Sequence, residues 1–90
     1  MPRTEPDHAL GGTVRGLREA GALTREALAF EAGITTGALA RIESGHVSPR
    51  WATLRAIARA LGLRTDQLVD QVEATRAVEE SAELIGEVCA

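Results

Sequence analysis

Residues 23–45, LTREALAFEAGITTGALARIESG, decide the fold of this chain of 90 residues. The stretch holds two threonines that can each cap a helix, and each lies between two apolar residues at the spacing of a hydrophobic staple. The two sets are Leu23, Thr24 and Leu28, then Ile34, Thr35 and Leu39. Gly33 stands where the first helix has to end, and glycine takes the left-handed conformation there without steric cost. The stretch therefore predicts two short helices joined by a tight turn.

These two helices, expected over residues 24–32 and 35–44, have the layout of a helix-turn-helix motif. Their expected core positions are Leu28 and Ala29 in the first helix, and Leu39 and Ile42 in the second. The second helix then turns four residues outward: Thr36, Gly37, Ala40 and Arg41. The rest of the chain is expected to support, flank or dimerise this motif.

Apolar residues at helical spacing predict one helix before the motif and two after it. The first begins at Asp7 or His8 and ends near Gly21, and three glycines weaken it: Gly11, Gly12 and Gly16. The fourth enters at Pro49 and ends with Gly62 as its cap. Its expected apolar face consists of Trp51, Leu54, Ile57, Ala58 and Leu61. Trp51 is expected in the first place to pack on the core or on the helix, and a position on the surface that the motif uses for binding stays open. The fifth begins at Thr65, and its apolar face is Leu68, Val69 and Val72.

Composition agrees with an all-α chain, because alanine is abundant and Phe30 and Trp51 are the two aromatic residues. One cysteine, Cys89, excludes an internal disulfide and a cysteine-based zinc site. We expect an inert thiol there, with a disulfide between two copies left open. No apolar run approaches the roughly 18–20 residues that cross a membrane, and the N-terminus has no signal-peptide core. A cytoplasmic protein with no membrane partner is expected.

The net charge of −3 conceals two parts of opposite sign. Residues 1–65 hold nine arginines against six acidic residues, whereas residues 66–90 hold one arginine against seven acidic residues. Such an asymmetry indicates a head that faces a polyanion, followed by an acidic extension. Periodicity predicts a helix over most of residues 73–86. Three roles for this extension stay open, besides a solvated tail: dimerisation, docking on its own domain, and binding a second protein.

Together these segments resemble the Cro and phage-repressor type of helix-turn-helix domain, the XRE-like family. The resemblance covers roughly residues 10–69, and its most specific part is RIESG at 41–45 followed by a proline and by TLRAIARALG at 53–62. It implies a compact, all-α, lambda-repressor-like domain of five helices over residues 9–72. A flexible arm at 1–8 would precede this domain, and an acidic helical extension at 73–90 would follow it.

The resemblance also implies a function, a partner and a site. The expected protein is a transcriptional regulator, in the first place a repressor, that binds double-stranded DNA as a homodimer on a palindromic operator. The residues expected to contact bases are Thr36, Gly37, Ala40 and Arg41. Those expected to contact phosphates are Arg25, Ser44, His46, Ser48 and Arg50. Arg18 and Glu43 match a structural ion pair between the first and third helices.

Two departures from the family pattern bear on these expectations. Arg25 stands where the family often has glutamine, and Ala27 stands where it has an acid, so the capping box is lost. The outward side of the third helix has a single long polar side chain, Arg41, although direct readout of bases needs such side chains. Sequence discrimination is therefore expected to be modest, or to rest partly on DNA shape.

Other classes of function stay open beside DNA regulation. The chain can be an antitoxin-type protein whose residues 73–90 bind a protein partner, or an adapter that binds no DNA. An enzyme is not expected, because His8 and His46 have no ligand or acid at the spacing of a metal or catalytic site. Ser44 and Ser48 lack the histidine and acid of a nucleophile, and no strand precedes the glycines at 11, 12 and 16. No cofactor and no metal are expected.

Overall fold

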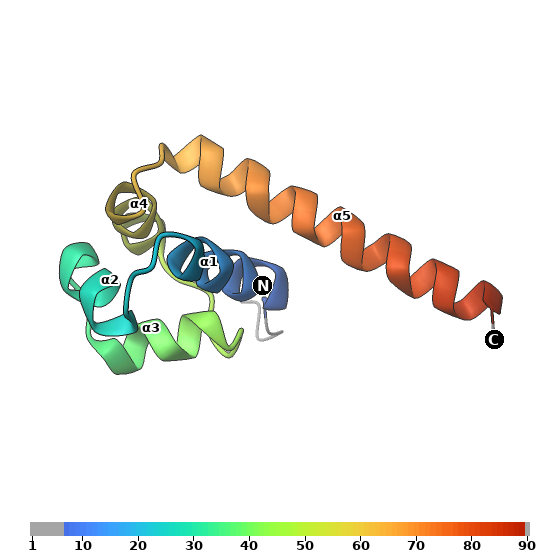
Figure 1. The fold of residues 1–90 in the computed structure, drawn as a ribbon, viewed down its shortest axis with the longest axis horizontal. Helices are drawn as coiled ribbons and strands as arrows, with labels where there is room; N and C mark the ends of the chain where they lie inside the picture. The colour runs from blue at the N-terminus through green and yellow to red at the C-terminus, as the bar shows by residue number, and fades with distance from the viewer. Residues whose placement is uncertain (1–6, 90) are drawn as a thin grey trace.

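The computed structural model describes the backbone of residues 7–89 and the side chains of residues 7–81. The chain forms five helices: α1 (His8–Ala20), α2 (Arg25–Ala32), α3 (Thr36–Glu43), α4 (Trp51–Ala60) and α5 (Thr65–Cys89). Figure 1 shows α1 to α4 gathered into a bundle, with the second half of α5 extending beyond it. The expected all-α architecture of five helices is confirmed. The arm predicted over residues 1–8 lies mostly outside the described residues and stays a prediction.

The local signals of residues 23–45 operate as predicted. Thr24 Oγ1 accepts a hydrogen bond from the Ala27 N–H at 3.0 Å, and Thr35 Oγ1 accepts one from the Ala38 N–H at 3.0 Å. Each threonine therefore satisfies a backbone donor that the first helical turn leaves free. Gly33 ends α2 with φ of 72°, in the left-handed region. This geometry fixes the direction in which α3 leaves the turn.

Each of the five helices contributes one side chain that is fully buried at the centre of the core. These five are Val14, Leu28, Leu39, Ile57 and Leu68. Ala29 and Ile42 are buried beside them, so the four core positions predicted for α2 and α3 are confirmed. One prediction for α5 was wrong. Val69 is 36% exposed, because only the narrow stripe through Leu68 and Val72 faces the core.

Gly11 allows α1 to lie unusually close to the end of α3. A Cβ atom at Gly11 would stand 2.5 Å from the carbonyl oxygens of both Ile42 and Glu43. Gly12 and Gly16 have open space around the same position. The sequence alone treated the three glycines alike, as a cost to helix stability, whereas Gly11 is required by the packing of α1 on α3.

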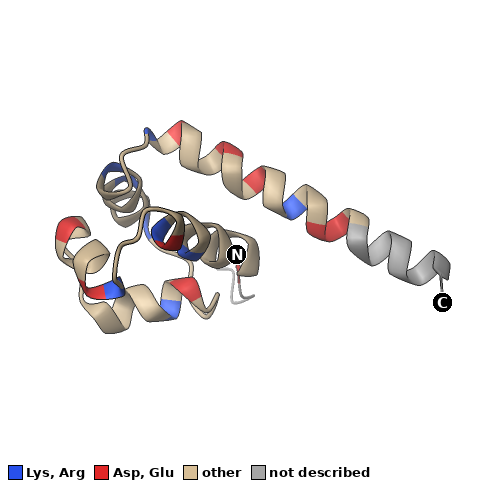
Figure 2. Ribbon diagram, in the orientation of Figure 1, with Lys and Arg blue, Asp and Glu red and all other residues tan. Residues whose placement is uncertain are grey.

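The first part of α5 docks on its own domain, and the remainder leaves it. Thr13 Oγ1 donates to Thr75 Oγ1 at 3.0 Å, and Arg76 Nη2 lies 3.3 Å from Oδ1 of Asp7, the residue that caps α1. Residues 77–81 are exposed. Acidic residues recur along residues 65–81 of α5, where Arg76 is the one basic residue (Figure 2). The helix predicted over 73–86 is confirmed, and the side chain of Cys89 lies outside the described residues.

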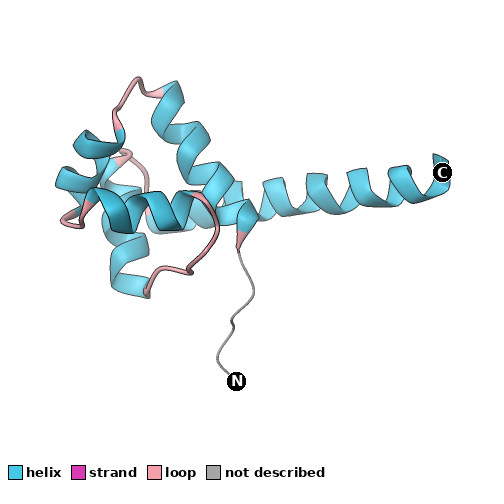
Figure 3. Cartoon of the chain, turned by 90° about the horizontal axis from the view of Figure 1, so that it is seen from below, coloured by secondary structure: helices cyan, strands magenta, loops and turns pink. Residues whose placement is uncertain are grey.

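Helices and connecting loops account for all of residues 7–89, as the view in Figure 3 shows. α4 ends with Leu61 as its cap, and Gly62 follows with φ of 78°, so the cap comes one residue before the predicted one. Among the described residues, no helix has the length and apolar character needed to cross a membrane.

Candidate nucleic-acid interface

The outward face of α3 presents the four residues that the sequence assigned to base contacts. Gly37 and Arg41 are exposed, and Thr36 and Ala40 are half-buried. Residues three and four positions apart are neighbours on a helix face, so the pairs Thr36–Ala40, Gly37–Arg41 and Gly37–Ala40 join the four into one short strip. The opposite face of α3 is buried in the core through Leu39, Ile42 and Glu43. Three of the four residues are small, and the Arg41 side chain is the one long polar group of the strip.

The first residues of the loop after α3, Ser44 to His46, are held in place by hydrogen bonds. Ser44 Oγ donates to the carbonyl oxygen of Arg41 at 3.1 Å and lies 2.6 Å from His46 Nδ1. The backbone N–H of His46 donates to the same carbonyl, and the backbone N–H of Asp7 donates to the carbonyl of Gly45, each at 3.0 Å. Ser44, His46 and Ser48 are exposed. The three predicted phosphate contacts of this loop therefore lie on an ordered surface next to Arg41.

A buried cluster of charges joins α1, α2 and α3. The Glu43 carboxylate, 2% exposed, accepts from Arg18 Nε at 2.8 Å and from Arg18 Nη2 at 3.1 Å. This hydrogen-bonded ion pair raises the pKa of Arg18 above its ordinary value. Arg18 Nη1 also donates to the carbonyl of Leu23, just before α2, at 3.0 Å. The expected pair of Arg18 and Glu43 is present, and it ties the motif to α1.

Arg25 belongs to this cluster as well, which the sequence did not indicate. Its Nε atom lies 3.4 Å from Glu43 Oε1, while its side chain stays 40% exposed at the start of α2. Two guanidinium groups around one carboxylate leave the cluster with one excess positive charge. Because Arg25 is the exposed member, that charge is available at the surface, where the sequence placed a phosphate contact.

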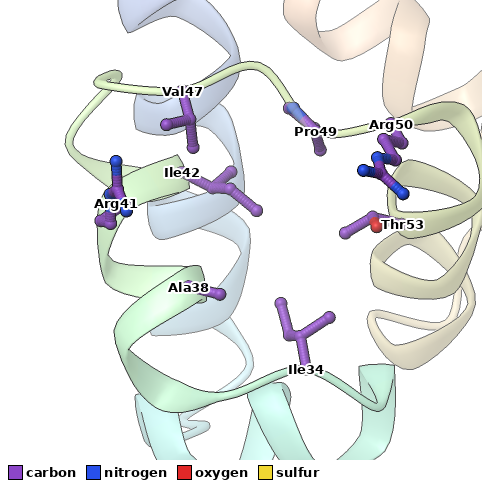
Figure 4. A pocket seen from close by; sticks show the side chains of 8 residues that line it. All are labelled: Ile34, Ala38, Arg41, Ile42, Val47, Pro49, Arg50 and Thr53. Carbon is purple, nitrogen blue, oxygen red and sulfur yellow. The ribbon is translucent and has the colours of Figure 1, made fainter.

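A cleft of about 280 Å³ separates α3 from the beginning of α4. Arg41 lies at one side of it and Arg50 at the other, as Figure 4 shows. Its remaining lining is mostly apolar: Ile34, Ala38, Ile42, Val47, Pro49 and Thr53. No acidic side chain within residues 7–81 forms an ion pair with Arg41 or Arg50. The two guanidinium groups therefore remain available to a phosphate or another anion.

Trp51 is a surface residue of this region, so of its two predicted positions the favoured one, on the core, was wrong. The side chain is 61% exposed at the first position of α4, directly after Arg50. The buried residues of α4 are Ile57 and Ala58, in its second half, so the first turn lies outside the core. The spacing of Trp51 to Leu54 suggested a core position. The position of Trp51 directly after Pro49 and Arg50, at the very start of the helix, was the sequence signal for an exposed residue.

Residues 9–72 match the family model described as a helix-turn-helix domain. The chain belongs to this helix-turn-helix family. Its type is that of the Cro and phage-repressor domains, the XRE-like group. As a helix-turn-helix protein of this type, it is a DNA-binding transcription regulator.

Several solved structures share the fold of this helix-turn-helix protein. The clp gene regulator ClgR from Corynebacterium glutamicum is 23% identical, with a TM-score of 0.86 over 97% of this chain and 90% of that one. The restriction-modification controller protein C.AhdI from Aeromonas hydrophila is 27% identical, with a TM-score of 0.67 over 69% and 94%. The DNA-binding domain of the P22 c2 repressor is 24% identical, with a TM-score of 0.64 over 76% and 86%. No curated protein matches the sequence.

Proposed function

We propose that the protein binds a palindromic DNA operator as a homodimer, with α3 in the major groove, and represses transcription by occupying that operator. The observation that supports this proposal most is the position of the exposed face of α3. Arg25 contacts Glu43 at the end of α3, and Arg50 lines a cleft together with Arg41 and Ala38 of α3, so cationic groups from α2 and α4 lie close to this helix. Such groups favour a helix that enters a groove, because phosphate backbones border the groove.

The proposed roles follow from side-chain length and exposure. Arg41 donates to a base edge, for which guanine is the usual partner of a bidentate guanidinium, and Thr36 contacts a base or a thymine methyl group. Gly37 and Ala40 let the backbone of α3 approach the base pairs. Phosphates are bound by Arg25 and by four residues that follow Arg41: Ser44, His46, Ser48 and Arg50. The Glu43 carboxylate limits the motion of Arg25, which reduces the entropy that Arg25 loses on binding.

The names of similar proteins agree with a regulatory role. ClgR is described as a gene regulator, C.AhdI as a controller protein, and the P22 domain as part of a repressor. Repression requires no further site on this chain, since a bound dimer can exclude polymerase from an overlapping promoter. We therefore propose repression as the mode of regulation.

Selection of bound DNA from a random pool at moderate salt tests sequence-specific binding. We expect an enriched inverted repeat whose half-site centres lie about 34 Å apart, one helical turn. A pool without enriched sequence would contradict the proposal and would favour a protein-interaction adapter. The selected site then serves in all later affinity measurements.

Arg25→Ala tests the phosphate contact at the start of α2. We expect weaker binding to every DNA sequence and a slope of log affinity against log salt that is smaller by about one. Arg15→Ala is the matched control, because Arg15 is exposed on α1 and pairs with Glu19. An unchanged slope in Arg25→Ala would remove this residue from the phosphate contacts.

A further inference from the structure

The junction of α4 and α5 forms a second basic surface, separate from the proposed DNA interface. A cleft of about 300 Å³ there is lined by Arg55, Arg59, Leu63, Arg64 and Thr65. The three arginines are exposed. Arg64 pairs with Asp66 at 3.2 Å, whereas Arg55 and Arg59 form no ion pair with any side chain of residues 7–81. We call this surface the basic corner.

The basic corner lies away from the surface assigned to DNA. Arg50 stands at the beginning of α4, beside α3, and Arg59 lies nine residues further on, about 13 Å along the helix axis. Figure 1 places the connection between α4 and α5 on the side of the bundle opposite α3. A helix in the major groove would therefore leave Arg59 and Arg64 away from the phosphates that Arg50 would contact, with Arg55 between them, about 8 Å along the axis from Arg50.

The projecting part of α5 has the complementary charge. Beyond Arg76 it leaves the domain, and Glu79 and Glu80 are exposed beside Val78, which is 69% exposed. Glu73 and Glu80 are seven residues apart, so they share one side of the helix. The sequence adds acidic residues at 83 and 87, which are three residues after Glu80 and then four residues further along. Residues 77–81 are the projecting part of this acidic extension whose side chains the structure describes.

Contact between the two surfaces within one chain is excluded by the straightness of α5. The helix starts at the basic corner and runs directly away from it (Figure 2), so Glu80 lies about 22 Å from Thr65 along the axis. A second copy of the chain does not have this restriction. When two α5 helices run antiparallel about a two-fold axis, the end of each lies beside the beginning of the other. The acidic extension of each copy then meets the basic corner of its partner.

We propose that the protein dimerises through these reciprocal contacts, with the acidic extension of each copy, through Glu79 and Glu80, on Arg55 and Arg59 of the other. The proposal deepens the homodimer of the proposed function and rests on it. In this arrangement each acidic extension meets arginines rather than the other acidic extension. Attraction between opposite charges also predicts that salt weakens the dimer.

Two charge-reversed variants of the full chain test the proposal. Glu79→Arg with Glu80→Arg makes extension and corner both basic, and Arg55→Glu with Arg59→Glu makes both acidic. Each variant alone is expected to dimerise about a hundredfold more weakly than wild type, because several exposed ion pairs become repulsions at two symmetric contacts. An equimolar mixture restores opposite charges at both contacts and is expected to form a heterodimer near wild-type affinity.

Sedimentation velocity without DNA measures these associations, so the result does not depend on operator binding. Arg15→Glu is the control for a charge change elsewhere and is expected to keep the wild-type association. Variants with glutamine at the same pairs of positions replace any reversed variant whose circular dichroism shows loss of helix. They are expected to weaken the dimer about tenfold.

Several results would overturn the proposal. These are a wild-type chain that is monomeric at tens of micromolar, a dimer that tightens with salt, and a mixture of the two variants that forms no heterodimer. Weaker DNA binding by Arg55→Glu with Arg59→Glu, together with an unchanged dimer, would assign the basic corner to DNA instead. If the random-pool selection enriches no sequence but the dimer is intact, sequence-specific DNA binding is rejected and the proposed dimer interface is retained.

Discussion

Gly11→Ala is the substitution for which the structure predicts an effect opposite to that of helix propensity. Alanine in a helix is favoured over glycine by about 1 kcal/mol, so the sequence alone predicts a more stable protein. The structure places the new Cβ atom 2.5 Å from two backbone carbonyl oxygens of α3, those of Ile42 and Glu43. Neither oxygen belongs to a side chain that can rotate away. The helices α1 and α3 would have to separate.

The size of the effect follows from these two opposing terms. Overpacking of a rigid core costs about 1–3 kcal/mol, and contact with backbone atoms places this case at the upper end. After subtraction of the gain in propensity, the free energy of unfolding should fall by about 2 kcal/mol. For a chain of this size that corresponds to a fall in Tm of about 8–15 °C.

Gly12→Ala and Gly16→Ala are matched controls on the same helix. Both positions have open space where the Cβ atom would lie, so each variant should be more stable than wild type by about 0.5–1 kcal/mol. Urea and thermal unfolding of the three variants give the comparison directly. A Gly11→Ala protein as stable as Gly12→Ala would refute the close approach of α1 and α3.

Two further substitutions test the site. Glu43→Ala leaves the Arg18 guanidinium buried without its partner, so the free energy of unfolding should fall by about 3–5 kcal/mol. Glu31→Ala, at an exposed position, should change it by less than about 0.5 kcal/mol. Equal effects of the two substitutions in urea unfolding would contradict the buried cluster. Trp51→Ala should likewise change the free energy of unfolding by less than about 0.5 kcal/mol, and a loss of about 2 kcal/mol or more would place Trp51 in the core. In the wild type, Trp51 should show the red-shifted fluorescence of an exposed indole, and this fluorescence should change when DNA binds.

The parts of the fold that could be predicted from sequence are those set by neighbouring residues. Thr24, Gly33 and Thr35 act on backbone atoms within a few positions, so their patterns gave the caps and the turn correctly. The spacing of apolar residues likewise gave the helices and the buried Leu28 and Leu39. Such signals need no knowledge of the packing partner.

The errors arose where contacts between distant segments decide. The need for glycine at Gly11 comes from Ile42 and Glu43 of α3, which are 31 and 32 residues further along the chain, and no local pattern encodes it. Periodicity assigned Trp51 and Val69 to core faces. The core does not reach the first turn of α4, where Trp51 lies, and on α5 it covers Leu68 and Val72 but leaves Val69 exposed. The attachment of Arg25 to Glu43 also depends on how α2 and α3 pack. The assignments of residues to bases and phosphates stay predictions, since they depend on a DNA partner.

The affinity of Arg41→Ala for the selected operator tests the central claim most directly. Arg41 is the one long polar side chain on the outward face of α3, so its removal should weaken binding by about 1–3 kcal/mol and relax specificity at one base pair of each half-site. Arg15→Ala should bind as wild type does. Equal affinity and specificity for Arg41→Ala and wild type would contradict the placement of α3 in the major groove.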